Sequence, residues 1–174
     1  MNVNALSLPA GLHVRPSQAN DYDFLVDLYK STRDDLDLID AEEEFIDDLK
    51  LKQFMAQAAS YEEQFPNSMN FIVEYHGERV GRVILDFGHN EILIVDISFL
   101  PKARNKGLGS GVMQSFKHCS DQVGIPLTLS VITDNISAKA FYQRLGFVYR
   151  EHHYPRDYLV YYPSGQRIQQ TVVQ

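Results

Sequence analysis

The 174-residue sequence contains one cysteine and too few basic residues to balance its acidic ones. The single cysteine, Cys119, cannot form an internal disulfide, which fits a reducing compartment. With 16 lysines and arginines against 23 acidic residues, the net charge is −7, which argues against non-specific binding to nucleic acid or anionic lipid. Long apolar runs are also lacking, so we expect neither a membrane span nor a secretory signal. These absences favour a cytoplasmic protein with no nucleic-acid or membrane partner.

What remains is the composition of an ordinary globular chain, with 44% hydrophobic and 22% charged residues. A chain of this length can bury a proper core, so we expect one domain over residues 1–174, with its core at 12–162. We interpret Cys119 as a small packing residue on a helix. Residues 163–174 are expected to form either a flexible tail or an exchanged strand at the interface of a homodimer.

The first third of the chain has mainly helical patterns. A short strand over Leu12–Pro16 precedes a helix for which Asp21 is a plausible cap. Nine acidic residues and no basic one lie between Asp34 and Asp48, interleaved with apolar residues at helical spacing. The pattern predicts helix from there to about Phe65, broken near Asp40.

The rest of the chain alternates between strand and helix patterns. The expected strands are Phe71–Tyr75, Arg79–Phe87, Ile92–Pro101, Leu127–Thr133 and two around Pro155. Ile92–Pro101 is apolar almost without alternation, which predicts burial on both faces. One helix follows Arg104 and ends at Gly124, and another, capped by Asn135 or Asp134, ends at Gly146. The order predicts a mixed α/β fold.

The segment Arg104–Phe116, "RNKGLGSGVMQSF", places three glycines at alternate positions where a helix begins. A helix N-terminus has unpartnered N–H groups and partial positive charge, and glycines let an anion approach the backbone. The segment lacks the Lys-Ser or Lys-Thr pair of an ATP-type loop, and its third glycine comes too soon for a dinucleotide fingerprint. A flexible turn without a ligand remains the alternative at this point.

Two motifs resemble the GNAT superfamily of acyl-CoA-dependent N-acetyltransferases. Arg104–Gly109 is similar to the signature R/Q-x-x-G-x-G/A, and Asn135–Phe147 is similar to N-x-x-A-x-x-F/Y-Y-x-x-x-G-F. The order of elements over residues 12–162 also agrees. The resemblance implies the GNAT fold, in which a mixed, mostly antiparallel sheet of about six to seven strands is flanked by about four helices.

The resemblance further implies acetyl-CoA as cosubstrate and assigns residues to it. The turn and helix start would hold the pyrophosphate, and the preceding strand would pair with the pantetheine arm, with the Phe99 amide polarising the thioester carbonyl. Asn135 would bond the arm, and Ala138 and Phe141 would wall its channel. The implied cofactor-binding set is Ile97, Ser98, Phe99, Leu100, Arg104, Asn105, Lys106, Gly107, Leu108, Gly109, Ser110, Asn135, Ala138 and Tyr142.

The resemblance gives Tyr142 the role of general acid toward the leaving thiolate. A thiol has a pKa of about 8.5 and a phenol about 10, so a neutral phenol can donate to the developing sulfur anion. The acceptor ammonium must lose a proton before it attacks. Asp96 is an acid inside an apolar strand, where burial disfavours the charged form, and is the candidate general base. Glu91 and Glu74 are rivals, and a carboxylate satisfied by backbone donors is the non-catalytic alternative for Asp96.

The sequence leaves the acceptor open. A small-molecule amine, a lysine side chain and a protein N-terminus all fit the reaction type. The acidic tract Asp34–Asp48 either attracts a cationic acceptor or is a solvated helix face. His152 and His153 could line the acceptor pocket, and no metal-ligand pattern accompanies them. The alternative function is a GNAT-like module that binds or senses acyl-CoA without catalysis.

Overall fold

The structure is a computed structural model that describes residues 8–165. The strands are β1 (Leu12–Pro16), β2 (Ser68–Tyr75), β3 (Glu78–Phe87), β4 (Ile92–Phe99), β5 (Leu127–Ile132), β6 (Val148–His153) and β7 (Arg156–Tyr161). The α-helices are α1 (Tyr22–Lys30), α2 (Glu43–Gln64), α3 (Leu108–Val123) and α4 (Ile136–Arg144). Short 3-10 turns are η2 (Ala19–Asp21), η3 (Asp34–Leu38) and η4 (Pro101–Ala103). The predicted order of elements is confirmed.

The strands form one mixed seven-stranded sheet in the order β1-β2-β3-β4-β5-β7-β6. β4 and β5 are parallel, with Ile92 opposite Leu127 and Ile94 opposite Leu129. The pairs β1–β2, β5–β7 and β6–β7 are antiparallel. Since parallel neighbours cannot be joined by a tight turn, the chain crosses from β4 to β5 through α3.

The described residues fall into two compact units. The N-terminal unit comprises Gly11–Ile84 and Asp96–Lys106, and the C-terminal unit comprises the other described residues. Each unit is described by itself below.

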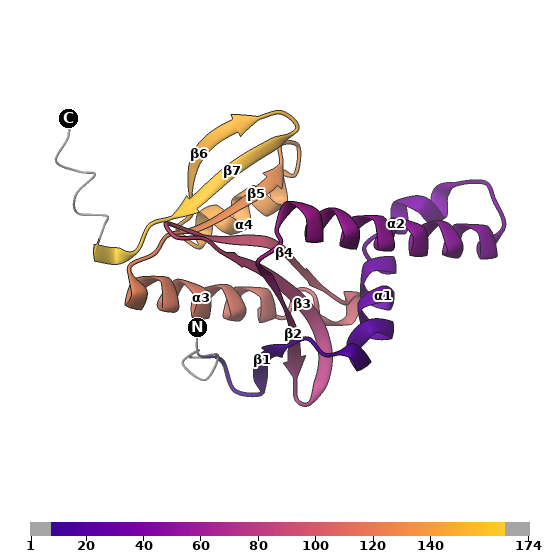
Figure 1. Ribbon diagram of the computed structural model, residues 1–174, viewed down its shortest axis with the longest axis horizontal. Helices are drawn as coiled ribbons and strands as arrows, with labels where there is room; N and C mark the ends of the chain where they lie inside the picture. The colour runs from indigo at the N-terminus through magenta and orange to yellow at the C-terminus, as the bar shows by residue number, and fades with distance from the viewer. Residues whose placement is uncertain (1–7, 166–174) are drawn as a thin grey trace. The chain divides into compact units, whose positions relative to one another are not determined.

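In the N-terminal unit, β1 pairs with β2 from Leu12 opposite Tyr75 to Pro16 opposite Phe71. The β2–β3 hairpin turns at His76 and Gly77, whose φ values of 50° and 81° match the two-residue turn that fits twisted strands. α1 and α2 pack together through buried side chains, with Leu25 and Leu51 at the edge of the cluster; the buried members are Val26, Tyr29 and Phe54. Figure 1 shows α2 as the long helix of this unit.

The acidic connection between α1 and α2 has the predicted break. η3 ends at Leu38, and α2 does not begin until Glu43. Three carboxylates stand in the first turn of η3 and two in that of α2, where the helix dipole favours negative charge.

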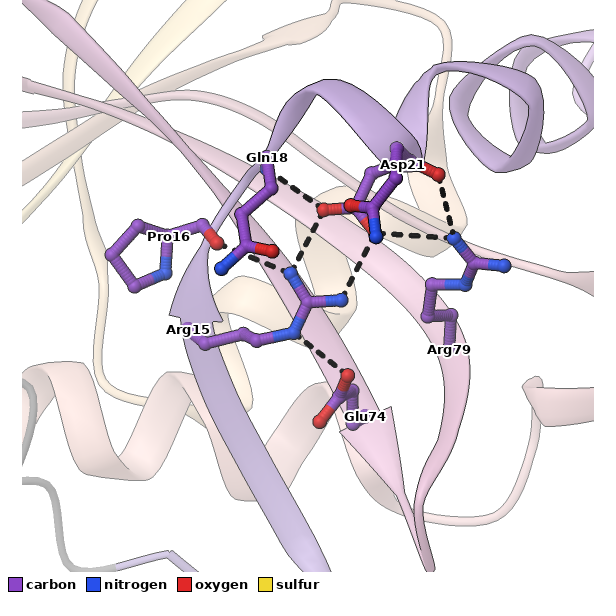
Figure 2. A network of polar contacts seen from close by, with 7 residues as sticks. Arg15, Pro16, Gln18, Asp21, Glu74 and Arg79 are labelled. Atoms are coloured by element: carbon purple, nitrogen blue, oxygen red, sulfur yellow. Dashed lines mark hydrogen bonds and ion pairs between the residues drawn. The ribbon is translucent and has the colours of Figure 1, made fainter.

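Asp21 does not cap α1 with its side chain, contrary to the sequence prediction. Its fully buried carboxylate instead accepts two hydrogen bonds from Arg15 of β1, at 2.8 and 2.9 Å, and one from the Gln18 amide at 2.8 Å. Arg79 of β3 adds a third cationic contact at 3.2 Å, and Arg15 also binds Glu74 of β2 (Figure 2). The Arg15 hydrogen bonds hold the pKa of Asp21 well below its usual range, against the effect of burial. This network fastens η2 to three strands.

The C-terminal unit is built around α3, which lies between two glycines with positive φ, Gly107 and Gly124. Its apolar face is fully buried, as the helical spacing predicts, through Val112, Met113, Phe116 and Cys119. β5 is buried and pairs with β7 along its length. α4 begins at the predicted cap Asn135 and is followed by Gly146 at φ 91°. β6 and β7 form the terminal hairpin, drawn in yellow in Figure 1.

The prediction that β4 is buried on both faces is wrong, and the strand ends at Phe99 rather than Pro101, which begins η4. Ile92 and Ile94 are buried, but the strand is only half-buried from Val95 to Phe99. An apolar strand therefore keeps part of its second half accessible.

Within residues 8–165 no helix is both long and apolar enough to cross a membrane. The prediction for the tail falls mainly on residues 166–174, which lie outside the described part of the chain.

Replacing Asp21 by asparagine should lower the free energy of unfolding by about 3 kcal/mol, because breaking a buried ion pair leaves charged partners uncompensated. Urea denaturation followed by circular dichroism measures this. Asp23→Asn is the matched control, since Asp23 is an exposed acid in the first turn of α1 and its loss should cost less than about 1 kcal/mol. Equal losses for the two variants would contradict the role given to Asp21.

Candidate active site

The glycine segment forms an exposed turn that leads into α3. After η4 the residues from Arg104 to Gly107 are exposed, and Asn105 and Gly107 take φ values of 58° and 76°. Asparagine and glycine are the residues that tolerate this left-handed region. No side chain caps the start of α3. The backbone N–H groups of its first turn are therefore available to another hydrogen-bond acceptor. A Cβ at Gly107 would meet no atom of the described chain within 4 Å, so the space beside its backbone is open.

The two basic residues of the turn differ in their contacts. The Arg104 guanidinium donates from Nε to the Phe99 carbonyl at 3.0 Å and from Nη2 to the Ser31 carbonyl at 3.4 Å. Arg104 thus braces the turn against the end of β4 and the end of α1. Lys106 is exposed. Both side chains bring positive charge to the start of α3, where the helix dipole has the same sign.

Asp96 lies in the half-buried part of β4 and is paired with a buried arginine. Arg82 of β3 donates from Nη2 to Asp96 Oδ2 at 2.6 Å, and the Ser98 hydroxyl lies 3.5 Å from the same oxygen. The Asp96 side chain is 25% exposed and that of Arg82 is 9% exposed. Within the described chain Oδ1 of Asp96 has no hydrogen-bond partner. Asp96 is therefore an ion-paired carboxylate with one oxygen available.

Arg82 was not identified from the sequence. The signal was present, because "ERVGRVILDF" places a basic residue inside an apolar strand, as "ILIVDISFLP" places an acid. Two opposite charges in neighbouring apolar strands indicate a pair, since a buried charge needs a partner. The rival bases are committed elsewhere: Glu74 binds Arg15 at 2.8 Å and Glu91 binds Arg150 at 2.7 Å.

Phe99, whose amide the resemblance assigns to the thioester carbonyl, packs over Gly81 of β3. A Cβ at Gly81 would lie 2.6 Å from the Ser98 carbonyl oxygen and 2.7 Å from the Phe99 ring. Only glycine permits this close approach, which fixes the position of Ser98 and Phe99 against β3.

α4 carries the other predicted site residues. Asn135 Oδ1 accepts a hydrogen bond from the Ala138 amide at 3.0 Å, and Asn135 thereby caps the helix. Ala138 and Tyr142, four residues apart, share one face of α4 and are both half-buried. The Tyr142 ring stands edge-on to Phe141 and Phe147, with centroids 5.1 and 5.7 Å away, which limits its rotation.

A second polar cluster, not predicted from the sequence, surrounds Asp157 of β7. The fully buried Asp157 carboxylate contacts His152 Nδ1 at 2.5 Å and Lys139 Nζ of α4 at 3.0 Å. Thr133 and Tyr149 lie at 3.2 and 3.3 Å. The bond with His152 lowers the pKa of Asp157 to about 2, assisted by Lys139 and Thr133 and opposed by burial. His153 instead contacts Glu151 at 3.2 Å on the surface.

The acidic tract is partly ion-paired. Four of its carboxylates bind basic residues, in the pairs Asp35–Arg33, Asp37–Lys50, Asp47–Lys30 and Asp48–Lys52. These pairs reduce the negative field that a polycation would experience. The described residues contain no group of three or more side chains suited to a metal ion.

Comparison with known proteins gives a family model and many solved structures. Residues 26–147 match the model of the acetyltransferase (GNAT) family. The PaiA N-acetyltransferase of Thermoplasma acidophilum in complex with coenzyme A is 13% identical, with a TM-score of 0.65 over 87% of this chain and 98% of its own. An acetyltransferase of Thermus thermophilus is 21% identical, with a TM-score of 0.64 over 89% and 99%.

The ribosomal-protein-S18-alanine N-acetyltransferase of Escherichia coli is 18% identical, with a TM-score of 0.59 over 86% of this chain and 90% of its own. A sequence search of curated proteins finds no match. At these identities the solved structures establish the fold, and the predicted fold class is confirmed.

Asp157→Asn should destabilise the terminal hairpin, because His152 and Lys139 lose their shared anion. The lowered pKa makes this contribution present above the ordinary value of 3.8 and lost as the pH falls toward about 2. The urea midpoint of the wild type should therefore exceed that of the variant at pH 6, and the difference should shrink between pH 4 and pH 2. Asp134→Asn, at an exposed acid before α4, is the control. A difference that does not depend on pH would contradict the ion-pair account.

Proposed function

Since the chain belongs to the acetyltransferase (GNAT) family, we propose that it transfers an acetyl group from acetyl-CoA, the family's donor, to a primary amine. The observation that supports this most strongly is the start of α3, where amides without a side-chain cap follow an exposed turn that bears two basic residues. Such a helix start suits a diphosphate. The open space beside Gly107 fits the close approach that phosphate oxygens need.

The donor would be held mainly by the backbone. We assign the pyrophosphate to the turn and first helical residues, from Arg104 to Ser110. The pantetheine arm would pair with the main chain from Ile97 to Leu100, in the part of β4 that is not fully buried. Asn135 would use its amide group, since its carbonyl oxygen already serves the helix cap, and Ala138 would border the arm. Acetyl-CoA supplies the activated acyl group as a thioester.

The reaction exchanges one bond for another without redox change. A C–N bond forms between the amine and the acetyl carbonyl carbon, and the C–S bond to coenzyme A breaks. The incoming ammonium loses one proton to become nucleophilic, and the leaving thiolate gains one. The Phe99 amide would donate a hydrogen bond to the carbonyl oxygen as negative charge develops there.

Asp96 would accept the proton that the ammonium loses, and Tyr142 would supply the proton that the thiolate gains. Asp96 has one free carboxylate oxygen to accept a proton from the ammonium, while Arg82 holds the other oxygen. Tyr142, fixed between Phe141 and Phe147, would donate to the sulfur. Cys119 is buried, and burial raises the pKa of its thiol, which argues against an acyl-cysteine intermediate. We therefore propose direct attack in a ternary complex.

Calorimetry with coenzyme A and thiol release from acetyl-CoA with a panel of amines test the proposal together. Binding with turnover supports an enzyme. Binding of coenzyme A without turnover on any amine would favour the non-catalytic sensing module, and absence of binding would remove the donor assignment.

Tyr142→Phe should reduce kcat on the order of a hundredfold or more, because the sulfur loses its proton donor while the ring packing is kept. Coenzyme A affinity should change little. Tyr154→Phe removes the hydroxyl of an exposed tyrosine, 75% accessible, in the turn between β6 and β7 and serves as the control. Unchanged turnover in Tyr142→Phe with several amines would exclude the acid role.

Gly107→Ala and Gly124→Ala form a matched pair at the two ends of α3. Both glycines have φ above 70°, and neither Cβ would meet an atom within 4 Å, so each substitution should cost about 1 kcal/mol of stability through backbone strain alone. Only Gly107→Ala should also weaken coenzyme A binding, by about tenfold or more. Isothermal calorimetry at a temperature where both variants are folded measures this. Equal coenzyme A affinity in the two variants would argue against an anion site at the start of α3.

A further inference from the structure

α4 carries Tyr142, the proposed proton donor, but few of its contacts with the rest of the C-terminal unit exclude solvent. None of its nine residues, Ile136–Arg144, is buried. The residues at its start, from Asp134 to Ser137, are all exposed. Its end is better fixed, because Leu145 and Phe147, which follow the helix, are 6% and 2% exposed. Since buried apolar contacts supply most of the stability of a protein helix, the start of α4 needs another attachment.

An ion pair with Asp157 of β7 attaches this part of α4. Lys139 Nζ lies 3.0 Å from Asp157 Oδ2, and the two side chains are 22% and 2% exposed. Among the described residues, Oδ2 hydrogen-bonds to Lys139 alone. The partners of the other oxygen, Oδ1, are Thr133, Tyr149 and His152. One oxygen of a buried carboxylate therefore serves α4, and the other serves the turn after β5 and strand β6.

The ion pair reaches α4 one helical turn before Tyr142. Lys139 and Tyr142 are three residues apart, so their side chains are neighbours on the helix surface. Ala138, which we propose to border the pantetheine arm, directly precedes Lys139. The Tyr142 ring contacts Phe141 and Phe147 with centroids 5.1 and 5.7 Å away. The aromatic contacts limit rotation of the ring, whereas the ion pair limits movement of the helix that carries it.

We propose that Lys139 and Asp157 are positioning residues, whose ion pair holds α4 where the Tyr142 phenol can donate to the leaving sulfur. This inference rests on the proposed acetyltransferase function and gives a role in it to two residues outside the proposed donor and acceptor contacts. Proton transfer needs a heavy-atom separation of roughly 2.6–3.2 Å. A displacement of α4 by about 1 Å is therefore enough to impair it.

Lys139→Met removes the charge and keeps a long apolar side chain. It should lower kcat by about tenfold or more, because the phenol is no longer held at hydrogen-bond distance from the sulfur. KM for acetyl-CoA and the affinity for coenzyme A should change by less than about threefold, since the donor is assigned mainly to β4 and the start of α3. Lys139→Arg keeps the charge and should have a kcat close to that of the wild type.

Tyr149→Phe is the matched control for Lys139→Met. It removes a contact of 3.3 Å to Asp157 Oδ1 and leaves the pair between Oδ2 and Lys139 intact. Its kcat should equal that of the wild type. Equal losses of kcat in Lys139→Met and Tyr149→Phe would overturn the inference, because the cluster would then act only through the stability of the terminal hairpin.

A double-mutant cycle separates positioning of Tyr142 from general damage to the protein. In a Tyr142→Phe background the phenol is absent, so Lys139→Met should have little further effect on kcat. Independent, additive losses in the double variant would show that Lys139 acts by another route, and the inference would be wrong.

Hydrogen exchange followed by mass spectrometry tests the attachment of α4 without an assay of activity. Lys139→Met should speed exchange of the Ile136–Arg144 amides by about tenfold and leave the amides of α3 at their wild-type rates. Tyr149→Phe should not change exchange in α4. Wild-type exchange rates throughout α4 in Lys139→Met would overturn the inference.

These outcomes are distinguishable from failure of the proposed function. An active wild type whose kcat is unchanged in Lys139→Met overturns the positioning role and leaves the acetyltransferase intact. If the wild type acetylates no amine, the proposed function fails and the catalytic role of the pair fails with it. The exchange rates would still show whether the pair holds α4.

Discussion

Parallel pairing of β4 with β5 is the constraint from which the candidate site follows. Two parallel neighbours require a crossover connection, and α3 provides it. β4 ends at Phe99 and α3 begins at Leu108, so the uncapped amides of the helix follow the strand after η4 and one exposed turn. Asn105 and Gly107 make that turn possible by taking positive φ. A strand with accessible backbone is thus succeeded along the chain by a positively polarised helix start, an arrangement suited to a long ligand that ends in phosphates.

Asp21, Asp157 and Asp96 are all held by hydrogen bonds, and their contacts show which of the three carboxylates is free to react. Asp21 is saturated by Arg15, Arg79 and the Gln18 amide. Asp157 is likewise fully engaged, by four side chains that come from the turn after β5, from α4 and from β6. Both networks stabilise local structure, and both lower the pKa of the carboxyl group. Asp96 differs because its contacts fall on one oxygen and its side chain is partly exposed. We therefore expect proton transfer at Asp96, the acid that has one carboxylate oxygen without a hydrogen-bond partner among the described residues.

The sequence predicted the elements well because their signals are local. Helix spacing, glycine stops and the Asn135 cap need only a few neighbouring residues. Predictions that depended on distant partners were less complete. Asp21 looked like a cap because its partners Arg15 and Arg79 come from separate strands. β4 looked fully buried because apolar composition does not report which half of a strand is covered. Arg82 was missed because neither strand alone shows that its charge meets Asp96. The acidic tract looked strongly negative because the basic partners of its four ion pairs all lie outside residues 34–48.

The Arg82–Asp96 pair shows how an acid can be held in a strand that is otherwise apolar. Arg82 donates to Asp96 Oδ2 at 2.6 Å, which fixes the position of the carboxylate on β4. Glu74 and Glu91 are each held by an arginine as well, but they lie outside the apolar run of β4. The contacts of Asp96 fall on one oxygen only, and its other oxygen is the one that we propose to accept the proton of the incoming amine.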